Sequence, residues 1–261
     1  MIFNISAGHN PDGKIACGAI GILKESTEAR KVKDEVIRLL RLDGHTVYDC
    51  TVEDGTSQSN VLNKIVAKSK EHDVDFEISI HFNSSAGADL IGDGKNKGTE
   101  VLVYSLSSAS VGMAKDIVNA ISALGFKNRG VIARPELYVL KHTKAPALLV
   151  ECCFVNDKDD VELYNYKSMA KAIVKGILGK TVTEKKSEDK VLYRVQVGAF
   201  GNKSNANILL KNVESRGFDA VIVKVGSLYK VQVGAFGIKE NAENMLKKLH
   251  KAGFDAFITK S

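Results

Sequence analysis

The sequence predicts an α/β domain with a doubly wound, twisted sheet flanked by helices, followed by a small α+β domain of two strand–helix–strand repeats. Three observations lead to this prediction. Segments with strand-type and helix-type apolar patterns alternate over residues 1–180, which favours a sheet with helices on both faces. Residues 181–190 have the composition of a flexible, charged linker. After this linker, short motifs recur with an offset of 36 residues.

The alternating apolar pattern sets the elements that we expect in residues 1–180. Strands are expected at 2–6, 46–50, 76–81, 100–104, 138–140 and 147–152. Four stripes of apolar residues at helical spacing predict helices, and we interpret the stripes as core positions. The stripes are Val32, Val36, Leu39 and Leu40; Val61, Leu62, Ile65 and Val66; Val111, Ala114, Ile117, Val118 and Ile121; and Ala170, Ile173, Val174 and Ile177.

The repeat defines the second domain, which we expect to span residues 191–261. The motif Val-Gln-Val-Gly-Ala-Phe-Gly occurs at 195–201 and again at 231–237, and Gly-Phe-Asp-Ala occurs at 217–220 and 253–256. Each unit contains a strand, an amphipathic helix and a second strand. Two such units fit the split βαβ arrangement, a four-stranded sheet with two helices on one face.

Charge is distributed unevenly between the two domains. Residues 1–180 contain 23 basic and 23 acidic residues, whereas residues 190–261 contain 12 basic and 5 acidic residues. A small basic domain suggests an anionic polymer as partner, such as nucleic acid or a bacterial wall. A basic surface that serves only solubility accounts equally well for the charge alone.

Cysteine usage and hydrophobicity narrow the class of protein further. The four cysteines form no metal-binding spacing, and we interpret them as reduced thiols in a core. No apolar run reaches the roughly 18 residues that span a bilayer, so we expect no membrane partner. The first residues enter a strand directly, without the pattern of a secretion signal, and we therefore expect synthesis in the cytoplasm.

Residues suited to metal binding and acid–base chemistry stand at strand ends. His9 and His81 follow or end apolar strand-type runs, and Glu151 follows another. Strands of an α/β sheet deliver such residues into one crevice. Glu25 lies in a glycine-punctuated loop that leads into a helix. Two imidazoles, a carboxylate and an open position for water form a catalytic zinc shell, and a second carboxylate would supply the general base. This pattern points to metal-assisted hydrolysis.

Four short motifs carry a resemblance to a known family. They are Gly-His-Asn at 8–10, Gly-Ala-Ile-Gly at 18–21 leading to Lys-Glu at 24–25, Ser-Ile-His-Phe-Asn at 79–83 and Leu-Val-Glu at 149–151. In this order, they resemble the zinc-dependent N-acetylmuramoyl-L-alanine amidases of the amidase 3 family, over residues 1–180. The resemblance implies one zinc ion bound by His9, Glu25 and His81, with Glu151 catalytic. The sequence departs from many relatives at Asn10, where they have glycine.

Glu28 is the alternative to Glu25 as the carboxylate ligand, since it follows only three residues later. Aligning the apolar positions of the family on Val32 and Val36 favours Glu25. Further residues could face the crevice and contact the substrate. We name Asn83, Arg129 and Arg134, because an arginine can hold a carboxylate of the peptide stem in bidentate fashion. A solvated arginine is the simpler interpretation of each.

The second domain resembles a SPOR domain over residues 191–261. The resemblance rests on Tyr-Arg-Val-Gln-Val-Gly-Ala-Phe at 193–200 and its copy Tyr-Lys-Val-Gln-Val-Gly-Ala-Phe at 229–236. It implies binding to peptidoglycan, typically to glycan strands without peptide stems, which are the product of an amidase. Gln196 and Gln232 are expected to project from the sheet face opposite the helices and to contact sugar hydroxyls; packing or solvent exposure is the plainer alternative.

Together these patterns predict a hydrolase that cleaves the amide bond between N-acetylmuramic acid and L-alanine of bacterial peptidoglycan. An endolysin of a phage is the biological role that we expect, acting at the wall after release. A sporulation or germination amidase is an alternative, and a zinc carboxypeptidase is another. A basic, RRM-like nucleic-acid-binding protein is the alternative of a different class, but its sheet would lack the usual aromatic run. The sequence leaves the oligomeric state open.

Overall fold

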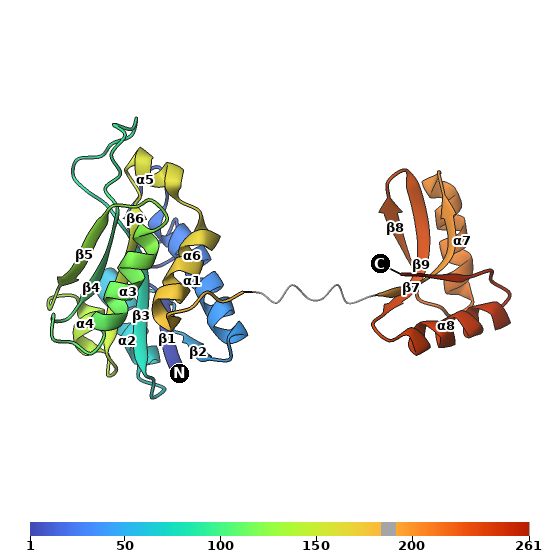
Figure 1. Cartoon of the computed structure of the whole chain (residues 1–261), viewed down its shortest axis with the longest axis horizontal. Helices are drawn as coiled ribbons and strands as arrows, with labels where there is room; N and C mark the ends of the chain where they lie inside the picture. The colour runs from blue at the N-terminus through green and yellow to red at the C-terminus, as the bar shows by residue number, and fades with distance from the viewer. Residues whose placement is uncertain (184–191, 261) are drawn as a thin grey trace. The chain divides into compact units, whose positions relative to one another are not determined.

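Two compact units make up the chain in the computed structural model, which describes residues 1–183 and 192–260 (Figure 1). The units are Met1–Val182 and Thr183–Ser261. The predicted linker, 181–190, falls mainly on residues 184–191, outside the described residues. Among the described helices, none combines the length and the hydrophobicity that crossing a membrane requires.

A six-stranded sheet in the order β2-β1-β3-β6-β4-β5 forms the centre of the first unit. Strands β2, β1, β3 and β6 run parallel, whereas β4 runs antiparallel to β6 and parallel to β5. The carboxyl ends of β1, β3 and β6 therefore meet at one edge of the sheet. The strands are β1 (Ile2–Ala7), β2 (Thr46–Asp49), β3 (Phe76–Asn83), β4 (Thr99–Val103), β5 (Asn128–Ala133) and β6 (Ala147–Phe154).

Helices cover both faces of this sheet, as the alternating pattern predicts (Figure 1). The apolar stripes of α1 (Glu25–Leu42), α3 (Val111–Ser122) and α6 (Tyr166–Leu178) pack on one face. Those of α2 (Gln58–Ser69) and the short α4 (Tyr138–His142) pack on the other. The α/β fold class is thus confirmed. A further short helix, α5 (Lys158–Leu163), follows β6.

The prediction of a strand at 138–140 is wrong, because these residues begin helix α4. The Tyr138 ring lies 4.3 Å from the His142 ring between centroids, and the Thr143 hydroxyl donates to the Val139 carbonyl at 2.8 Å. Both contacts join residues four apart, which a helix permits and a strand does not. A run of three β-type residues is too short to distinguish the two by pattern.

Strand β5 (Asn128–Ala133) was not predicted. It lies at the edge of the sheet, has no buried residue, and contains Gly130 with φ +86°. A glycine and a weak apolar alternation remove the usual signature of a strand. The strand forms through pairing with β4, which the local sequence pattern does not predict.

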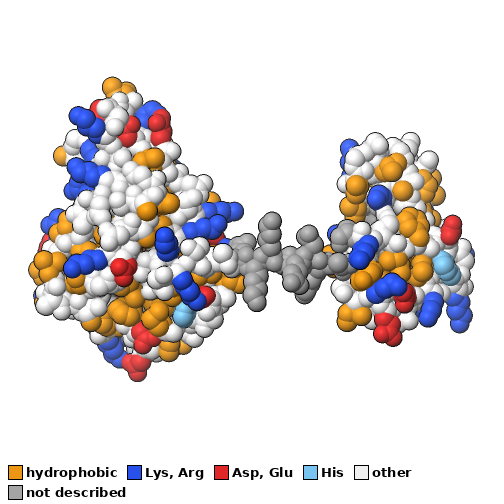
Figure 2. Space-filling model, viewed as in Figure 1, with side chains coloured by type: hydrophobic (Ala, Val, Ile, Leu, Met, Phe, Trp, Pro, Cys, Tyr) orange, Lys and Arg blue, Asp and Glu red, His pale blue; other side chains and the backbone are white. Residues whose placement is uncertain are grey.

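The second unit contains a four-stranded antiparallel sheet in the order β10-β7-β9-β8. Alternate residues of the two central strands, including Val195 and Val231, are buried against the two helices. The predicted split βαβ arrangement is therefore observed. In the view of Figure 2, its Lys and Arg side chains lie among hydrophobic ones. The elements are β7 (Tyr193–Phe200), α7 (Lys203–Ser215), β8 (Val221–Val225), β9 (Leu228–Phe236), α8 (Lys239–Lys251) and β10 (Phe257–Lys260).

Candidate active site

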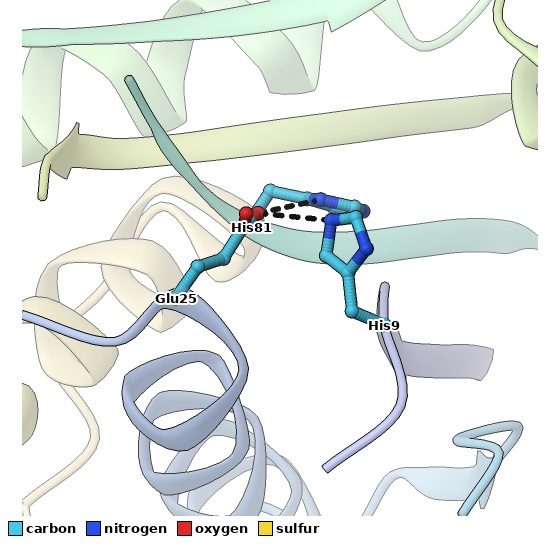
Figure 3. A group of neighbouring side chains, drawn as sticks. All are labelled: His9, Glu25 and His81. Carbon is cyan, nitrogen blue, oxygen red and sulfur yellow. Dashed lines mark hydrogen bonds and ion pairs between the residues drawn. The ribbon is translucent and has the colours of Figure 1, made fainter. Parts of the chain in front are cut away.

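Three of the predicted site residues meet at the carboxyl edge of the six-stranded sheet (Figure 3). His9 stands in the loop after β1, Glu25 is the first residue of α1, and His81 lies near the end of β3. The carboxylate oxygen Oε1 of Glu25 is 3.2 Å from Nε2 of His9 and 3.1 Å from Nδ1 of His81. Figure 3 shows the three side chains turned toward one another from three separate segments.

The Glu25 carboxylate is held in its ionised form. It is only 4% exposed, and the backbone N–H groups of Ala19 and Phe82 donate to it at 2.8 and 3.2 Å. Burial alone would raise its pKa, but the hydrogen bonds and charges of His81 and His9 outweigh burial and lower the pKa well below the usual range. Burial lowers the pKa of His81, which favours the neutral imidazole. A carboxylate and a neutral imidazole are the protonation states that a metal ion requires.

Two glycines make room for this group. A Cβ on Gly8 would lie 1.8 Å from Cε1 of His81, inside the imidazole ring. A Cβ on Gly18 would lie 2.5 Å from a carboxylate oxygen of Glu25, and Gly18 has φ +81°, which L side chains rarely adopt. A Cβ at either position would collide with these side chains, so the observed approach of the backbone requires glycine.

The donor set fits a zinc ion. Ligand atoms held about 2.1 Å from one tetrahedral zinc stand about 3.4 Å apart, which agrees with the two measured separations of 3.1 and 3.2 Å. All three donor atoms lie within 4.8 Å of one another. Two nitrogens and one oxygen leave the fourth position of a zinc shell for water or substrate. His9, Glu25 and His81 can therefore hold a catalytic metal.

Glu151 lies beside this group, on the neighbouring strand β6 and directly opposite His81 in the strand register. Its Oε2 atom is buried and has no hydrogen-bond partner in the described part of the chain. Burial raises the pKa of Glu151 well above the usual range, and the negative charges of Glu25 and Glu100 raise it further. A carboxyl group with a raised pKa and a free oxygen, next to a metal site, is suited to proton transfer.

Glu100 forms a second acidic position, on β4 opposite Glu151. Asn83 donates to one of its oxygens at 2.9 Å and Arg129 donates to the other at 2.5 Å. The Arg129 guanidinium also lies over the Phe154 ring, 5.1 Å from its centroid. Of the candidates for substrate contact, Asn83 and Arg129 thus hold Glu100 in this structure.

A cleft of about 460 Å³ opens over the site. His9, His81, Glu100 and Glu151 line its floor, while α4 and the segment before it form a wall that the sequence did not reveal, because a strand was expected there. Arg134, the third substrate-contact candidate, lines the cleft with a half-exposed side chain.

Glu28, the alternative ligand, lies outside the metal-binding group. It accepts a hydrogen bond from the Tyr164 hydroxyl at 3.1 Å and pairs with Lys31 at 2.8 Å.

Arg30 was not among the residues predicted from the sequence, but its guanidinium donates to the carbonyls of His9 at 2.7 Å and Val52 at 3.0 Å. Arg30 thereby ties the loop that carries His9 to helix α1. A single arginine within an amphipathic helix gives no signal of such a contact.

In the second unit, Gln196 and Gln232 face each other on the two central strands. The same register row continues to Phe257 on one edge strand and Val221 on the other. Phe257 is 48% and Val221 56% exposed, whereas Gln196 is only 3% and Gln232 9% exposed. The two glutamine side chains are therefore buried between exposed apolar side chains.

The fold and the site together define an α/β protein with a group of residues that can hold a metal ion, and comparison with known proteins identifies its family. Residues 4–180 match the family model of N-acetylmuramoyl-L-alanine amidases, and residues 189–260 match that of SPOR domains. The chain belongs to the N-acetylmuramoyl-L-alanine amidase family and carries a SPOR domain.

The chain is also similar to individual proteins, one of which is named an amidase. The chain is 32% identical to an uncharacterized protein of Clostridium perfringens (strain 13 / Type A), over 73% of this chain and 54% of that protein. It is also 32% identical to the sporulation-specific N-acetylmuramoyl-L-alanine amidase of Bacillus subtilis (strain 168), over 57% of this chain and 56% of that protein. It therefore spans only about half the length of these relatives.

Among solved structures, the catalytic domain of the CD27L endolysin, which targets Clostridia Difficile, is similar with a TM-score of 0.62. The two chains are 26% identical, and the match covers 70% of this chain and 99% of that one. The match thus extends over nearly the whole of that catalytic domain.

Proposed function

We propose that this protein is a zinc-dependent N-acetylmuramoyl-L-alanine amidase, which hydrolyses the amide bond between N-acetylmuramic acid and L-alanine in bacterial peptidoglycan. The observation that carries the proposal is the group of His9, Glu25 and His81, with the unpartnered Oε2 of Glu151 beside it in one cleft. The first three residues would be the ligands of one zinc ion per chain.

Glu151 is the proton carrier in this proposal. Zinc bound there would act as a Lewis acid, which polarises a carbonyl group and makes a water molecule more acidic. Glu151 takes a proton from the attacking water on its free oxygen and then delivers it to the nitrogen of the departing alanine. Burial raises the pKa of Glu151, and this direction favours the protonated carboxyl group that the second step needs.

The cleft offers contacts for the peptide stem. Arg134 is half-exposed at its wall and 3.5 Å from Glu136, so its guanidinium can exchange that carboxylate for one of the substrate. Asn83 and Arg129 act through Glu100 in this proposal, as they bind it on both sides.

The SPOR domain would hold the enzyme on glycan strands. We propose the sheet face with Gln196 and Gln232 as the glycan-binding surface, where two amides lie between exposed apolar side chains that sugar rings can cover. The basic character of residues 190–261 would add attraction to the anionic wall.

For the biological role, we propose an endolysin that acts at the cell wall, on the basis of similarity to the CD27L endolysin catalytic domain. A sporulation amidase is the second candidate, favoured by the similarity to the Bacillus subtilis enzyme. The chemistry proposed for the site is the same in both roles.

Digestion of purified cell walls tests the activity directly. Mass analysis of the products should find new free amino termini of alanine, and a chelator should abolish their release until zinc is restored. Shortened peptide stems with intact lactyl amides would instead identify a carboxypeptidase. Undiminished cleavage in the presence of a strong chelator, with no zinc retained, would contradict the metal assignment.

A further inference from the structure

Polar side chains occupy one face of strands β1 and β3 directly behind the metal-binding group. Asn4 and Ser6 on β1 pair in register with Glu77 and Ser79 on β3, and His81 follows Ser79 by two residues on the same face of β3. All five residues are at most 9% exposed. Burying polar groups is costly unless each finds a hydrogen-bond partner, so this row needs an internal network.

Within this row, Ser79 contacts the imidazole that carries a proposed ligand atom. Nδ1 of His81 faces Glu25 at 3.1 Å, and Nε2 lies 3.0 Å from the Ser79 hydroxyl oxygen. A neutral imidazole carries one hydrogen, so a ring that gives its Nδ1 lone pair to a metal must carry that hydrogen on Nε2. The Ser79 oxygen stands where it accepts this N–H.

The hydrogen of the Ser79 hydroxyl then needs an acceptor of its own. The Ser6 hydroxyl donates to the Ser79 oxygen at 3.3 Å, so with Nε2–H both lone pairs of that oxygen are engaged. A cavity of about 20 Å³ adjoins Ser79, and Ser6 and Glu77 also line it. This volume exceeds the roughly 10–15 Å³ that one water molecule requires. Most of the lining is apolar, but Ser6, Ser79 and Glu77 supply polar partners for such a molecule.

We propose that Ser79 is a positioning residue for His81. It accepts the Nε2–H hydrogen bond, and one water molecule in the cavity accepts the Ser79 hydrogen and donates to the Glu77 carboxylate. The inference rests on the proposed function, because it assumes that His81 binds zinc through Nδ1. The chain from histidine through serine and water to a buried carboxylate keeps the ring turned toward the metal, as outer partners of metal-bound histidines generally do.

Glu77 is suited to end this chain. Its Oε1 atom already accepts from Asn4 at 2.9 Å and from the Ser69 hydroxyl, so the carboxylate is anchored in the core. A carboxylate has about four lone-pair sites, which leaves capacity for a water molecule in the cavity.

The test compares Ser79→Ala with Ser6→Ala, which removes a hydroxyl of the same size in the same row. Zinc affinity of the full chain is measured by competition with a chelator, and solvent exchange of the His81 Nε2–H is measured by ¹⁵N NMR of the zinc-loaded protein. Ser79→Ala should weaken zinc binding about tenfold and speed the exchange. Ser6→Ala should cause only a small part of either change.

Unchanged affinity and unchanged exchange in Ser79→Ala, with zinc bound normally by the parent, would overturn the positioning role and leave the amidase proposal intact. A parent that binds no zinc would instead refute the proposed function. A high-resolution crystal structure tests the water: an ordered molecule within hydrogen-bond reach of Ser79 and Glu77 is expected, and an empty cavity would remove that part of the inference.

Discussion

Glu25 illustrates how one side chain can join three segments of the chain. Its carboxylate accepts hydrogen bonds from the loop at Ala19 and from strand β3 at Phe82, while it faces both imidazoles. Glu28, one helical turn later, points instead to Tyr164. The two glutamates are therefore a matched pair for testing the metal site.

We predict that Glu25→Ala and His81→Ala lose bound zinc and activity together, while Glu28→Ala keeps both. The reason is that Glu25 and His81 each place a donor atom in the metal-binding group, whereas Glu28 does not. Zinc content after dialysis, measured by atomic spectroscopy, checks the prediction. Stoichiometric zinc in His81→Ala, or its loss from Glu28→Ala, would contradict the ligand assignment.

We predict that Glu151→Gln folds, binds zinc and loses most of its turnover. The amide is nearly isosteric with the carboxyl group but cannot carry the proton, so the rate should fall by about 10²–10⁴-fold. Release of wall fragments under saturating substrate measures the loss. A variant within a few-fold of the parent would assign proton transfer to another group.

We predict that Gly8→Ala abolishes zinc binding although it adds one methyl group. The new Cβ would overlap the His81 ring and displace it from Glu25. The control is Gly112→Ala in helix α3, where a Cβ meets nothing within 4 Å. That change should leave zinc unaffected and stabilise the protein by less than about 1 kcal/mol, because the preference of helix interiors for alanine over glycine applies only in part at the second residue of a helix. Equal zinc content in both variants would contradict the steric argument.

At the scale of elements, an ion pair fastens helix α1 to the end of strand β2. Lys33 is 5% exposed and its ammonium lies 2.7 Å from an oxygen of Asp49. Burial raises the pKa of Asp49, but hydrogen bonds from Lys33 and from the Thr51 backbone outweigh burial, so that the pKa is lowered. Helix α1 carries Glu25, and the pair therefore anchors the element that positions this residue.

This pKa gives a pH prediction with a defined sign. Because the pKa of Asp49 is lower in the folded state than in the unfolded state, the unfolded state binds more protons and stability rises with pH. The contribution of the pair is present above about pH 4 and is lost as the pH falls further.

Asp49→Asn should weaken the loss of stability below about pH 4. It should also reduce the free energy of unfolding at neutral pH by about 1 kcal/mol or less. Chemical denaturation across a pH series measures both effects. Asp34→Asn serves as the control, because Asp34 also pairs with Lys33 but its side chain is 69% exposed. If the free energy of unfolding falls equally at acid pH in the parent and in Asp49→Asn, other carboxylates control this fall.

For the whole molecule, each unit has a hydrophobic core of its own. We predict that residues 1–182 alone fold and retain cleavage, and that residues 192–261 alone fold and bind peptidoglycan without cleaving it. Stem-free glycan should bind better than intact wall, so that the product holds the enzyme near uncut stems and raises their local concentration. Sedimentation with purified wall, before and after amidase treatment, measures the preference.

The salt dependence of binding distinguishes specific contacts to the glycan from electrostatic attraction to the anionic wall. Binding through the basic surface should weaken as ionic strength rises, whereas contacts to sugar hydroxyls should persist. Equal binding to RNA and to stem-free glycan, both lost at moderate salt, would indicate a nonspecific basic domain and remove the targeting argument.

Much of this architecture follows from local pattern in the sequence. Apolar periods near two and near 3.6 predicted five of the strands and four helices of the first unit, and the 36-residue repeat predicted the split βαβ domain. The strand at 138–140 and the missing β5 were errors, because one run was too short and the other too polar for its period to decide.

The sequence by itself determined which residues we propose for the chemistry: His9, Glu25, His81 and Glu151 stand at strand ends or a helix start, and each position is a local property of the chain. Only the tertiary structure decided that β6 lies between β3 and β4, which puts Glu151 opposite both His81 and Glu100. It also decided that a serine and a buried carboxylate lie behind His81. Strand order and side-chain partners depend on contacts between residues far apart in the chain, and local periodicity does not encode these contacts.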